Sequence, residues 1–291
     1  MKQLLILSGK GGTGKTTIAS AFIKLANARA YADCDVDAPN LHLVNAWSTE
    51  PEKADYYGLK KAVIDPDLCI ECDQCRQNCR FDAISMADKY EVNAYACEGC
   101  GVCEYVCPVG AVAMAPSVDG ELMLHFDGEK VFSTAQLKMG SGTSGLLVTE
   151  VKKRMRSIEV EAELAIIDGS PGIGCPVIAS LRGVDMVLIV AEPSISGISD
   201  MERIVDTAAK FGIKIAVCIN KYDSNIELTE KIERWCADHQ LPFVGRIPFD
   251  PDAVRAVNAG KTIVDVDCIS GNAVRDIYQK TIDLLFEEDA G

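Results

Sequence analysis

The sequence GKGGTGKTT, residues 9–17, has the form of a phosphate-binding loop. An apolar run over residues 4–8 precedes it, and a helical pattern over residues 15–27 follows. Backbone N–H groups of a glycine-rich loop at a helix N-terminus surround phosphate oxygens. A strand, the full motif and a helix in this order favour a nucleotide site over an incidental glycine-rich turn. We therefore expect the chain to bind ATP.

The residues of this loop have distinct expected roles. The glycines let the backbone wrap closely around the phosphates, and Lys15 is expected to reach the β- and γ-phosphates. The hydroxyl of Thr16 is expected to bind Mg²⁺. The predicted phosphate-binding residues are Gly9, Lys10, Gly11, Gly12, Thr13, Gly14, Lys15, Thr16 and Thr17.

Strand and helix patterns alternate over most of the 291 residues. Short, nearly continuous apolar runs are typical of parallel strands that are covered on both faces. The alternation predicts an α/β fold with a doubly wound, mostly parallel sheet. The expected strands are 4–8, 30–34, Leu164–Asp168, Met186–Ala191, Lys214–Asn220 and Phe243–Ile247; the expected helices are 15–27, 146–155, 199–211, 225–239 and 272–287; and 121–126 with 130–132 is expected to form a hairpin.

Lys10 adds a second lysine that a plain phosphate loop does not need. The pattern K-G-G-x-G-K-T from Lys10 resembles the deviant Walker A loop of the MinD/Mrp/nitrogenase-iron-protein class of ATPases. The resemblance implies that Lys10 reaches across an ATP-sandwich dimer to the nucleotide of the partner. The partner would be a second copy or a related chain. A solvated lysine beside a loop is the alternative.

The resemblance continues in DCDVDAPNL, residues 33–41, which looks like the switch I segment of this class. It implies that Asp33 supports Mg²⁺ through water and that Asp35 orients the attacking water. Orientation suits phosphoryl transfer, in which positioning and charge stabilisation dominate catalysis. The catalytic residues implied by the match are Lys10, Lys15 and Asp35.

Residues 165–172, AIIDGSPG, resemble a Walker B strand that runs into switch II. By this match Asp168 is a carboxylate near Mg²⁺, and Gly172 offers its N–H to the γ-phosphate. Asn220 and Pro248 match positions that surround the adenine. The resemblance covers nearly the whole chain outside a cysteine-rich insert.

That insert contains two cysteine runs of the form C-x2-C-x2-C-x3-C, offset by 28 residues. This is the spacing of a two-cluster ferredoxin, in which the fourth cysteine of each run ligates the other [4Fe–4S] cluster. Two zinc ions are the alternative, although the spacing is unusual for zinc. The crossed pattern assigns Cys69, Cys72, Cys75 and Cys107 to cluster I, and Cys97, Cys100, Cys103 and Cys79 to cluster II.

The strand and helix patterns break near residues 65–116, where cysteine-rich segments are expected to fold around their metal. We expect a small α+β ferredoxin-like domain over residues 61–116, inserted into an ATPase domain made of residues 1–60 and 117–291. Because the insert lies between switch I and switch II, its position is expected to follow the nucleotide state. The architecture resembles MinD-superfamily ATPases that carry an inserted ferredoxin domain.

The other cysteines carry weaker signals. Cys175 lies just past switch II, near the place where the nitrogenase iron protein ligates a shared cluster. A small buried residue is the favoured interpretation of Cys175. Cys34 and Cys218 are expected in the core.

The net charge of −14 argues against a nucleic-acid partner, because phosphate neutralisation needs clustered Lys and Arg. It also argues against anionic membranes. The acidic stretch 283–289 is unlike the basic amphipathic helix with which MinD-type proteins bind membranes. No export signal precedes the phosphate loop, and the eight cysteines suit cluster ligation, so a cytoplasmic location is expected.

The leading hypothesis is an ATP-hydrolysing, nucleotide-switched dimer that couples ATP turnover to electron transfer through two [4Fe–4S] clusters. Its partner would be a redox protein. The alternative is an assembly scaffold or carrier that hands clusters to an acceptor. Complete internal cysteine cages favour electron transfer, while Cys175 keeps the carrier hypothesis open.

Overall fold

The computed structural model describes residues 1–43, 47 and 49–287. Its main body is an α/β fold with a large, mostly parallel sheet, as the alternation predicts. From β13 to β9 neighbouring strands are parallel, and the last two pairs are antiparallel. Among the described residues the sheet order is β13 (Phe243–Ile247), β12 (Lys214–Asn220), β11 (Met186–Ala191), β1 (Lys2–Leu7), β10 (Leu164–Asp168), β2 (Ala30–Asp33), β9 (Val131–Leu137), β8 (Val118–Phe126) and β3 (Glu52–Tyr57).

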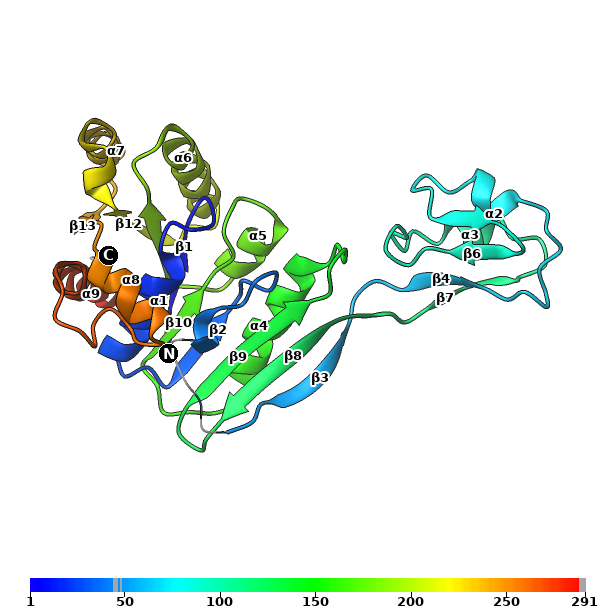
Figure 1. Ribbon diagram of the computed structural model, residues 1–291, viewed down its shortest axis with the longest axis horizontal. Coiled ribbons are helices and arrows are strands. Elements are labelled where there is room, and N and C mark those ends of the chain that lie inside the picture. The colour runs from blue at the N-terminus through cyan, green and yellow to red at the C-terminus, as the bar shows by residue number, and fades with distance from the viewer. Residues whose placement is uncertain (44–46, 48, 288–291) are drawn as a thin grey trace.

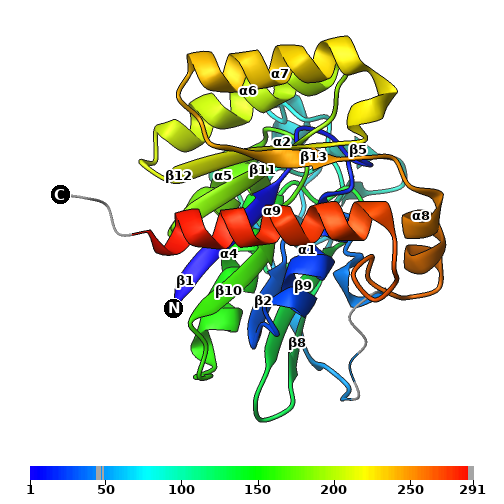
Figure 2. The same ribbon diagram turned by 90° about the vertical axis from the view of Figure 1, so that its left-hand side faces the viewer.

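Helices cover both faces of this sheet (Figures 1 and 2). Each face has its own core of buried aliphatic side chains, which explains why the central strands are apolar throughout. Side chains of α4 (Ser144–Ser157), α5 (Cys175–Leu181), α6 (Ile195–Ala209) and α7 (Ile226–Asp238) contribute to one core. Side chains of α1 (Lys15–Leu25) and α9 (Ile269–Phe286) contribute to the other, and α8 (Pro251–Asn258) packs against it. Short 3₁₀ turns lie at Leu41–Leu43 and Tyr222–Ser224.

The long helices differ from the predicted ones mainly at their N-termini. Helix α6 begins four residues before the predicted start because Ser194 caps it, accepting the N–H of Gly197 at 3.1 Å. Cys268 caps α9 in the same way, accepting the N–H of Gly271. The short helices α5 and α8 were not predicted.

The cysteine-rich segment leaves the main body on a ribbon of two antiparallel strands (Figure 1). Strands β3 and β8 pair at the sheet edge, and the ribbon continues through β4 (Lys61–Ile64) and β7 (Val112–Ala115). We call β4 and β7 the stalk and residues 65–111 the lobe. The lobe contains α2 (Gln74–Gln77), α3 (Val102–Tyr105) and a hairpin of β5 (Ile84–Met86) and β6 (Tyr90–Val92).

The point of attachment lies away from the two switch segments between which the insert stands in sequence. The stalk continues from β3 and β8, the last two strands at one edge of the sheet. Strands β9 and β8 separate β3 from β2. The lobe does return to the main body at one loop. A Cβ added at Gly140 would lie 3.2 Å from Cδ1 of Tyr95, and one at Gly142 would lie 3.8 Å from Oε2 of Glu98.

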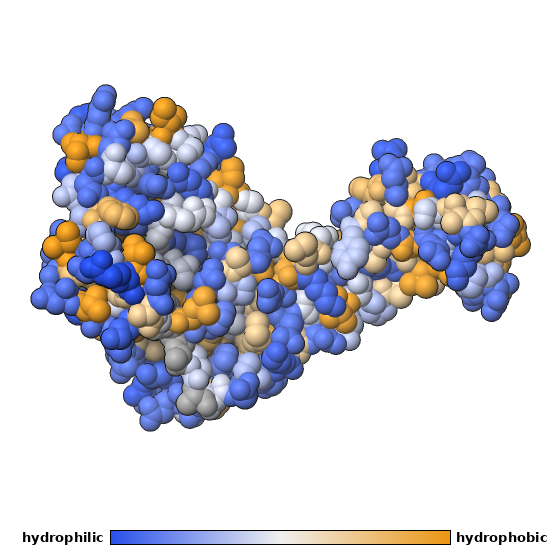
Figure 3. Space-filling model, viewed as in Figure 1, coloured by the Kyte–Doolittle hydropathy of each residue, from blue (hydrophilic) through white to orange (hydrophobic). Residues whose placement is uncertain are grey.

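The lobe and the stalk together bury a small core around Ala62, Ala83, Cys97 and Val112, and several other cysteines pack against it. Hydrophobic side chains therefore reach its surface beside polar ones (Figure 3). Tyr105 is 90% exposed and Ile70 is 60% exposed.

Two observations bear on the predictions about membranes. Within the described residues, no helix has the length and apolar character required to cross a membrane. Glu288 and Asp289, part of the acidic stretch 283–289, lie outside the described residues.

Candidate functional site

The phosphate loop joins β1 to α1 as its sequence predicts. Gly14 is the N-cap of α1 with φ 91°, a left-handed conformation that glycine adopts freely. A Cβ at Gly14 would also lie 2.3 Å from Nδ2 of Asn220, so no larger residue fits there. At the base of the loop, the Ser8 hydroxyl donates to the carbonyl oxygen of Lys10 at 3.0 Å. The free N–H groups at the start of α1 therefore face the loop as an anion site.

Lys15 and Asp168 form a buried ion pair beneath this loop. The Nζ to Oδ1 distance is 2.5 Å, and the side chains are 5% and 0% exposed. Burial alone lowers the pKa of Lys15, but the charge and hydrogen bond of Asp168 outweigh it, and the pKa is raised. The other carboxylate oxygen of Asp168, Oδ2, has no hydrogen-bond partner in the described structure. The pair joins the expected Walker A and Walker B residues through neighbouring strands β1 and β10.

Asp33 organises the segment that resembles switch I. Its fully buried carboxylate accepts the N–H groups of Asp35, Asn40 and Leu41, each at 3.0 Å. Burial and, after it, the charge of Asp168 are the main causes that raise the pKa of Asp33 to about 7. Burial also raises the pKa of the half-buried Asp35, partly offset by Lys15. Three carboxylates thus surround one ammonium, which leaves the site short of positive charge.

Lys10 lies over the same region but is bound within its own chain. Its Nζ lies 3.1 Å from Oε2 of Glu192 and donates to the Ser194 hydroxyl at 3.2 Å. Both partners follow β11. Lys10 is therefore an anchored residue in the single chain, not a freely solvated one.

Gly172 differs from its expected role in this structure. Its N–H donates to the carbonyl oxygen of Ser8 at 3.0 Å, with φ 95°. A bond from this N–H to a γ-phosphate would require that link to the phosphate loop to open.

The threonines of the loop divide into two environments. Thr13 is buried, and its hydroxyl has no partner among the described residues. Thr16 accepts a hydrogen bond of 3.4 Å from Nζ of Lys15, so its hydroxyl lies beside the buried ion pair. Gly9 packs against α6, where a Cβ would lie 2.2 Å from Cβ of Asp200.

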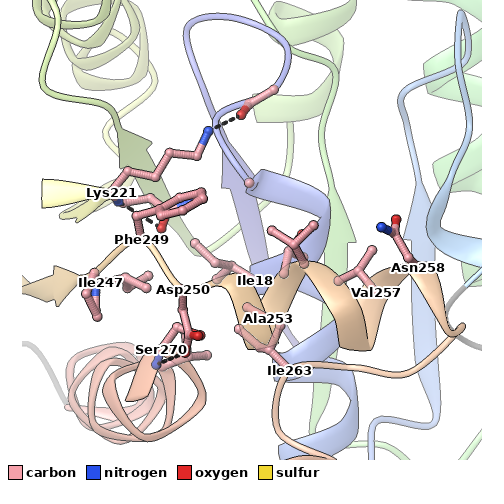
Figure 4. Close-up of a pocket in the computed structure, with 17 residues that line it drawn as sticks. Ile18, Lys221, Ile247, Phe249, Asp250, Ala253, Val257, Asn258, Ile263 and Ser270 are labelled. Carbon is pink, nitrogen blue, oxygen red and sulfur yellow. Dashed lines mark hydrogen bonds between the residues drawn. The ribbon is translucent and has the colours of Figure 1, made fainter. Parts of the chain in front are cut away.

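Residues at the end of β12 hold the loop from the other side. The side-chain amide of Asn220 donates to the carbonyl oxygen of Thr13 at 2.7 Å, and Nζ of Lys221 donates to that of Gly12 at 3.0 Å. Figure 4 shows Lys221 reaching over to the loop. Asn220, the predicted adenine neighbour, therefore helps to position the loop.

A cavity of about 220 Å³ opens beside the loop (Figure 4). One wall comes from Gly12, Gly14, Thr17 and Ile18, and the opposite wall from residues 247–250, α8 and the start of α9. The lining is mainly aliphatic, as suits a flat heterocyclic ring. Pro248, the other predicted adenine neighbour, lies in this wall. The wall residues that sequence reasoning missed are Ile247, Phe249, Asp250, Ala253, Val254, Val257, Asn258, Ile263, Ser270 and Val274.

Asp250 fixes the shape of that wall. The Asp250 carboxylate accepts the N–H of Asp252 and thereby caps α8. It also accepts the N–H of Ser270 at 3.0 Å, and this hydrogen bond links α8 to α9. The hydrogen bond from Ser270 is the main cause that lowers the pKa of Asp250. An aspartate followed by Pro251 is a helix-start signal, so the sequence did contain a clue to α8.

The eight lobe cysteines fall into two groups around two small cavities. One cavity is lined by Cys69, Cys72, Cys75 and Cys107, and the other by Cys79, Cys97, Cys100 and Cys103. These are the two crossed sets that the sequence predicts, and we call them the cluster I set and the cluster II set. Within the described residues, no three His, Cys, Asp or Glu side chains form a group that could hold a metal ion.

The remaining cysteines correct one expectation. Cys34 and Cys218 are buried as predicted, and so are Cys236 and Cys268. Cys175 is exposed, so the interpretation of this residue as a small core side chain is wrong. Cys175 is the first residue of α5. It lies against Gly145 of α4, because a Cβ added at Gly145 would be 3.2 Å from the Cβ of Cys175.

Comparison with known proteins identifies the main body. Residues 4–263 match the family described as the CobQ/CobB/MinD/ParA nucleotide binding domain. The chain belongs to this family. It is a nucleotide-binding ATPase of the MinD/ParA type, which confirms the expected superfamily.

Three relatives show how far the similarity extends. An uncharacterized protein of Methanocaldococcus jannaschii is 30% identical over 281 residues, which are 96% of this ATPase and 95% of that protein. MinD of Pyrococcus horikoshii OT3, solved with Mg-ADP, has the same fold, with a TM-score of 0.59 at 18% identity over 98% of this chain and 97% of that one. Pyruvate synthase subunit PorD of Methanothermobacter marburgensis is 36% identical over 67 residues, which are 23% of this chain and 80% of that subunit.

Proposed function

We propose that the protein is an ATP-hydrolysing, nucleotide-switched dimer that couples ATP turnover to electron transfer through two [4Fe–4S] clusters in its lobe. The observation that carries the proposal is that the eight lobe cysteines line two cavities as crossed sets of four. The same chain has a phosphate loop next to an adenine-sized cavity. The domain division into residues 61–116 and the two flanking ATPase segments is part of this proposal.

The nucleotide half of the proposal follows from the charges around the loop. The phosphates of ATP would lie on the loop N–H groups and Lys15, with the adenine in the cavity beside Pro248. The excess of carboxylate over ammonium, and the unpartnered Oδ2 of Asp168, fit a Mg²⁺ ion held by Thr16 and supported by Asp33 through water. Asp35 would orient the attacking water.

The donor chemistry of the lobe fits iron–sulfur clusters. Thiolates are the ligands that such clusters prefer, and each set offers four of them around one cavity. Each thiolate of a [4Fe–4S] cluster binds a different iron, so the sulfurs surround a cluster without converging on one ion. This accounts for two cysteine cavities without a single-ion group.

A cluster scaffold or carrier is the second candidate function, and the exposure of Cys175 favours it. A thiol at the surface beside switch II could take part in a cluster shared between subunits. The two complete lobe sets favour electron transfer, because cargo sites are usually open and shared. The partner would be a redox protein in the first case and a cluster acceptor in the second. We also propose that the protein acts in the cytoplasm.

Asp33 predicts a proton release when Mg²⁺ and nucleotide bind near pH 7. A carboxyl with a pKa of about 7 is partly protonated at that pH, and a nearby cation favours its charged form. Without nucleotide, the stability contributed by protonated Asp33 is fully present below its ordinary pKa of 3.8 and is lost as the pH rises through about 7. Calorimetry in two buffers of different ionisation enthalpy measures the release. Equal heats in both buffers would contradict it.

Replacing Lys10 with Ala is expected to weaken ATP-dependent association while it spares most nucleotide binding. Lys10 can reach a partner's nucleotide only by leaving Glu192 and Ser194. Glu192→Gln is the matched variant, because it frees Lys10 and should preserve or strengthen association. Light scattering with ATP or ADP and Mg²⁺ tests this. A dimer that forms equally well in wild type and Lys10→Ala would refute the role of Lys10.

Coupling between the two halves is the central test of the proposed function. The contacts of Tyr95 with Gly140 and of Gly145 with Cys175 join the lobe to α4 and then to switch II. If ATP shifts the cluster potentials by this path, reduction must shift ATP affinity by the same free energy. We expect reduced and oxidised protein to bind a non-hydrolysable ATP analogue with different affinities in anaerobic titrations. Equal affinities and unchanged potentials would mean that the lobe is only tethered.

A further inference from the structure

The buried thiol of Cys268 stands behind the wall of the adenine-sized cavity, at the start of α9. Cys268 is 6% exposed and is the N-cap residue of that helix. N-cap positions favour Ser, Thr, Asp and Asn, whose side-chain oxygen accepts an N–H of the first helical turn. Cysteine is not among these residues, and Cys268 belongs neither to the phosphate loop nor to the two cysteine sets.

The sulfur atom joins the start of α9 to the loop that connects α8 to α9. Sγ accepts the N–H of Gly271 at 3.3 Å and donates to the carbonyl oxygen of Ile263 at 3.4 Å. It also lies 3.5 Å from the Ser270 hydroxyl. Ile263 belongs to the connecting loop, whereas Ser270 and Gly271 belong to the first turn of α9. One side chain therefore sets the spacing between these two segments.

Two of the three partners of this thiol line the cavity. Ile263 and Ser270 both form part of its wall (Figure 4). They are 2% and 3% exposed, so water scarcely reaches them. The packing behind them is tight, because a Cβ added at Gly271 would lie 2.4 Å from the carbonyl oxygen of Ile263. The position of this part of the wall thus depends on what lies behind it.

The same thiol adjoins the carboxylate that links α8 to α9. The N–H of Ser270 is the main cause that lowers the pKa of Asp250, and the Ser270 hydroxyl and the Cys268 thiol lower it further. Cys268 therefore lies beside Asp250 as well as behind Ile263. Both links that hold the wall together meet at this residue.

We propose that Cys268 is a positioning residue for adenine, because its thiol holds Ile263 and Ser270 where they form the wall against which the base packs. The phosphates would bind at the loop before α1, away from this thiol. Loss of the thiol should therefore weaken the contacts of the base and spare those of the phosphates. The inference rests on the proposed place of adenine in this cavity, and adds a residue that none of the nucleotide-binding motifs contains.

Replacing Cys268 with Ala leaves the buried N–H of Gly271 and the carbonyl of Ile263 without this partner, and unpaired buried polar groups are costly. The wall can relax in the free protein and must be ordered again when the base binds. We expect Cys268→Ala to weaken binding of a non-hydrolysable ATP analogue about five-fold, which corresponds to about 1 kcal/mol. Binding of inorganic tripolyphosphate should stay nearly unchanged.

The test is calorimetric titration of the full chain with each of these two ligands in the presence of Mg²⁺, with thermal unfolding of every variant to show that it is folded. Cys268→Ser keeps a donor and an acceptor at the cap, so it should restore wild-type affinity for both ligands. Cys236→Ala is the matched control, because it removes another buried thiol, on α7 in the core of the other face of the sheet. It should lower stability without changing either affinity.

The outcomes separate this inference from the proposed function. The positioning role is overturned, while the place of adenine stands, if Cys268→Ala binds the ATP analogue as tightly as wild type. It is also overturned if this variant loses affinity for both ligands equally, or if Cys236→Ala weakens binding of the analogue as much. If the wild type binds the analogue and tripolyphosphate equally tightly, the base gains nothing from the cavity. The proposed place of adenine then fails, and the role of Cys268 fails with it.

Discussion

Lys15→Ala is expected to weaken binding of Mg²⁺ and ATP by about 100-fold, which corresponds to about 2.7 kcal/mol. Its ammonium is the one cation paired with Asp168 beneath the loop. Its loss removes a charge-assisted contact to the phosphates and leaves Asp33, Asp35 and Asp168 to repel them. Titration with a fluorescent ATP analogue measures the change. Lys24→Ala, on the outer side of the same helix, is the matched control and should keep wild-type affinity.

The same substitution also affects folding, and the two effects can be separated. Without Lys15, the charge of Asp168 is buried and unpaired, and this should lower the free energy of unfolding by about 3–5 kcal/mol. Adding Asp168→Asn removes that charge and should restore much of the stability. The double variant should then be folded and still bind ATP poorly. A folded Lys15→Ala variant with wild-type affinity would contradict the role of Lys15.

The nucleotide site was largely predictable because its residues follow successive strands of a parallel sheet. The carboxyl ends of such strands gather at one edge, so motifs far apart in sequence meet there. Lys15 after β1 and Asp168 at the end of β10 form an ion pair for this reason. The adenine-sized cavity was less predictable. Its wall is assembled from short segments between Ile247 and Val274, each with three or fewer apolar residues that line the cavity.

The stalk was not predictable, because its strands lack an alternating hydrophobic pattern. In β4, Ala62 is buried, whereas its apolar neighbour Val63 is exposed and Ile64 is only partly buried. A ribbon that projects into solvent has no buried face to impose a period of two. Helices α5 and α8, with seven and eight residues, are likewise too short for a helical period to stand out.

The position of the stalk changes how coupling is expected to work. Sequence order places the lobe between the two switches, whereas in the fold its strands extend the outer edge of the sheet. Among the described residues, β9 and β8 separate β3 from β2, the strand that leads into switch I. Switch II reaches the lobe through α5, the N-terminal end of α4 and the loop at Gly140. Coupling should therefore depend on this loop more than on the covalent connections.

Replacing Cys97 with Ser is expected to remove one of two clusters, so that iron falls from about eight to about four per chain. Cys97 is buried, lines the cluster II cavity and stands against Lys61. A serine hydroxyl of nearly the same size keeps the fold but is a poor, hard ligand for iron. Iron analysis and the visible spectrum of anaerobically isolated protein measure the loss. Cys175→Ser, outside both sets, should retain all the iron.

The crossing of the two sets gives this prediction its sharpest form. Cys79 belongs to the first run in sequence, yet it lines the cluster II cavity with Cys97. Cys79→Ser should therefore remove the same paramagnetic signal as Cys97→Ser, and Cys107→Ser should remove the other. If Cys79→Ser instead removed the signal that Cys69→Ser removes, each run would hold its own cluster and the crossed arrangement would be wrong. Stoichiometric zinc in every variant, without a brown chromophore, would show that both cysteine sets hold zinc. The lobe would then be a structural module of the ATPase.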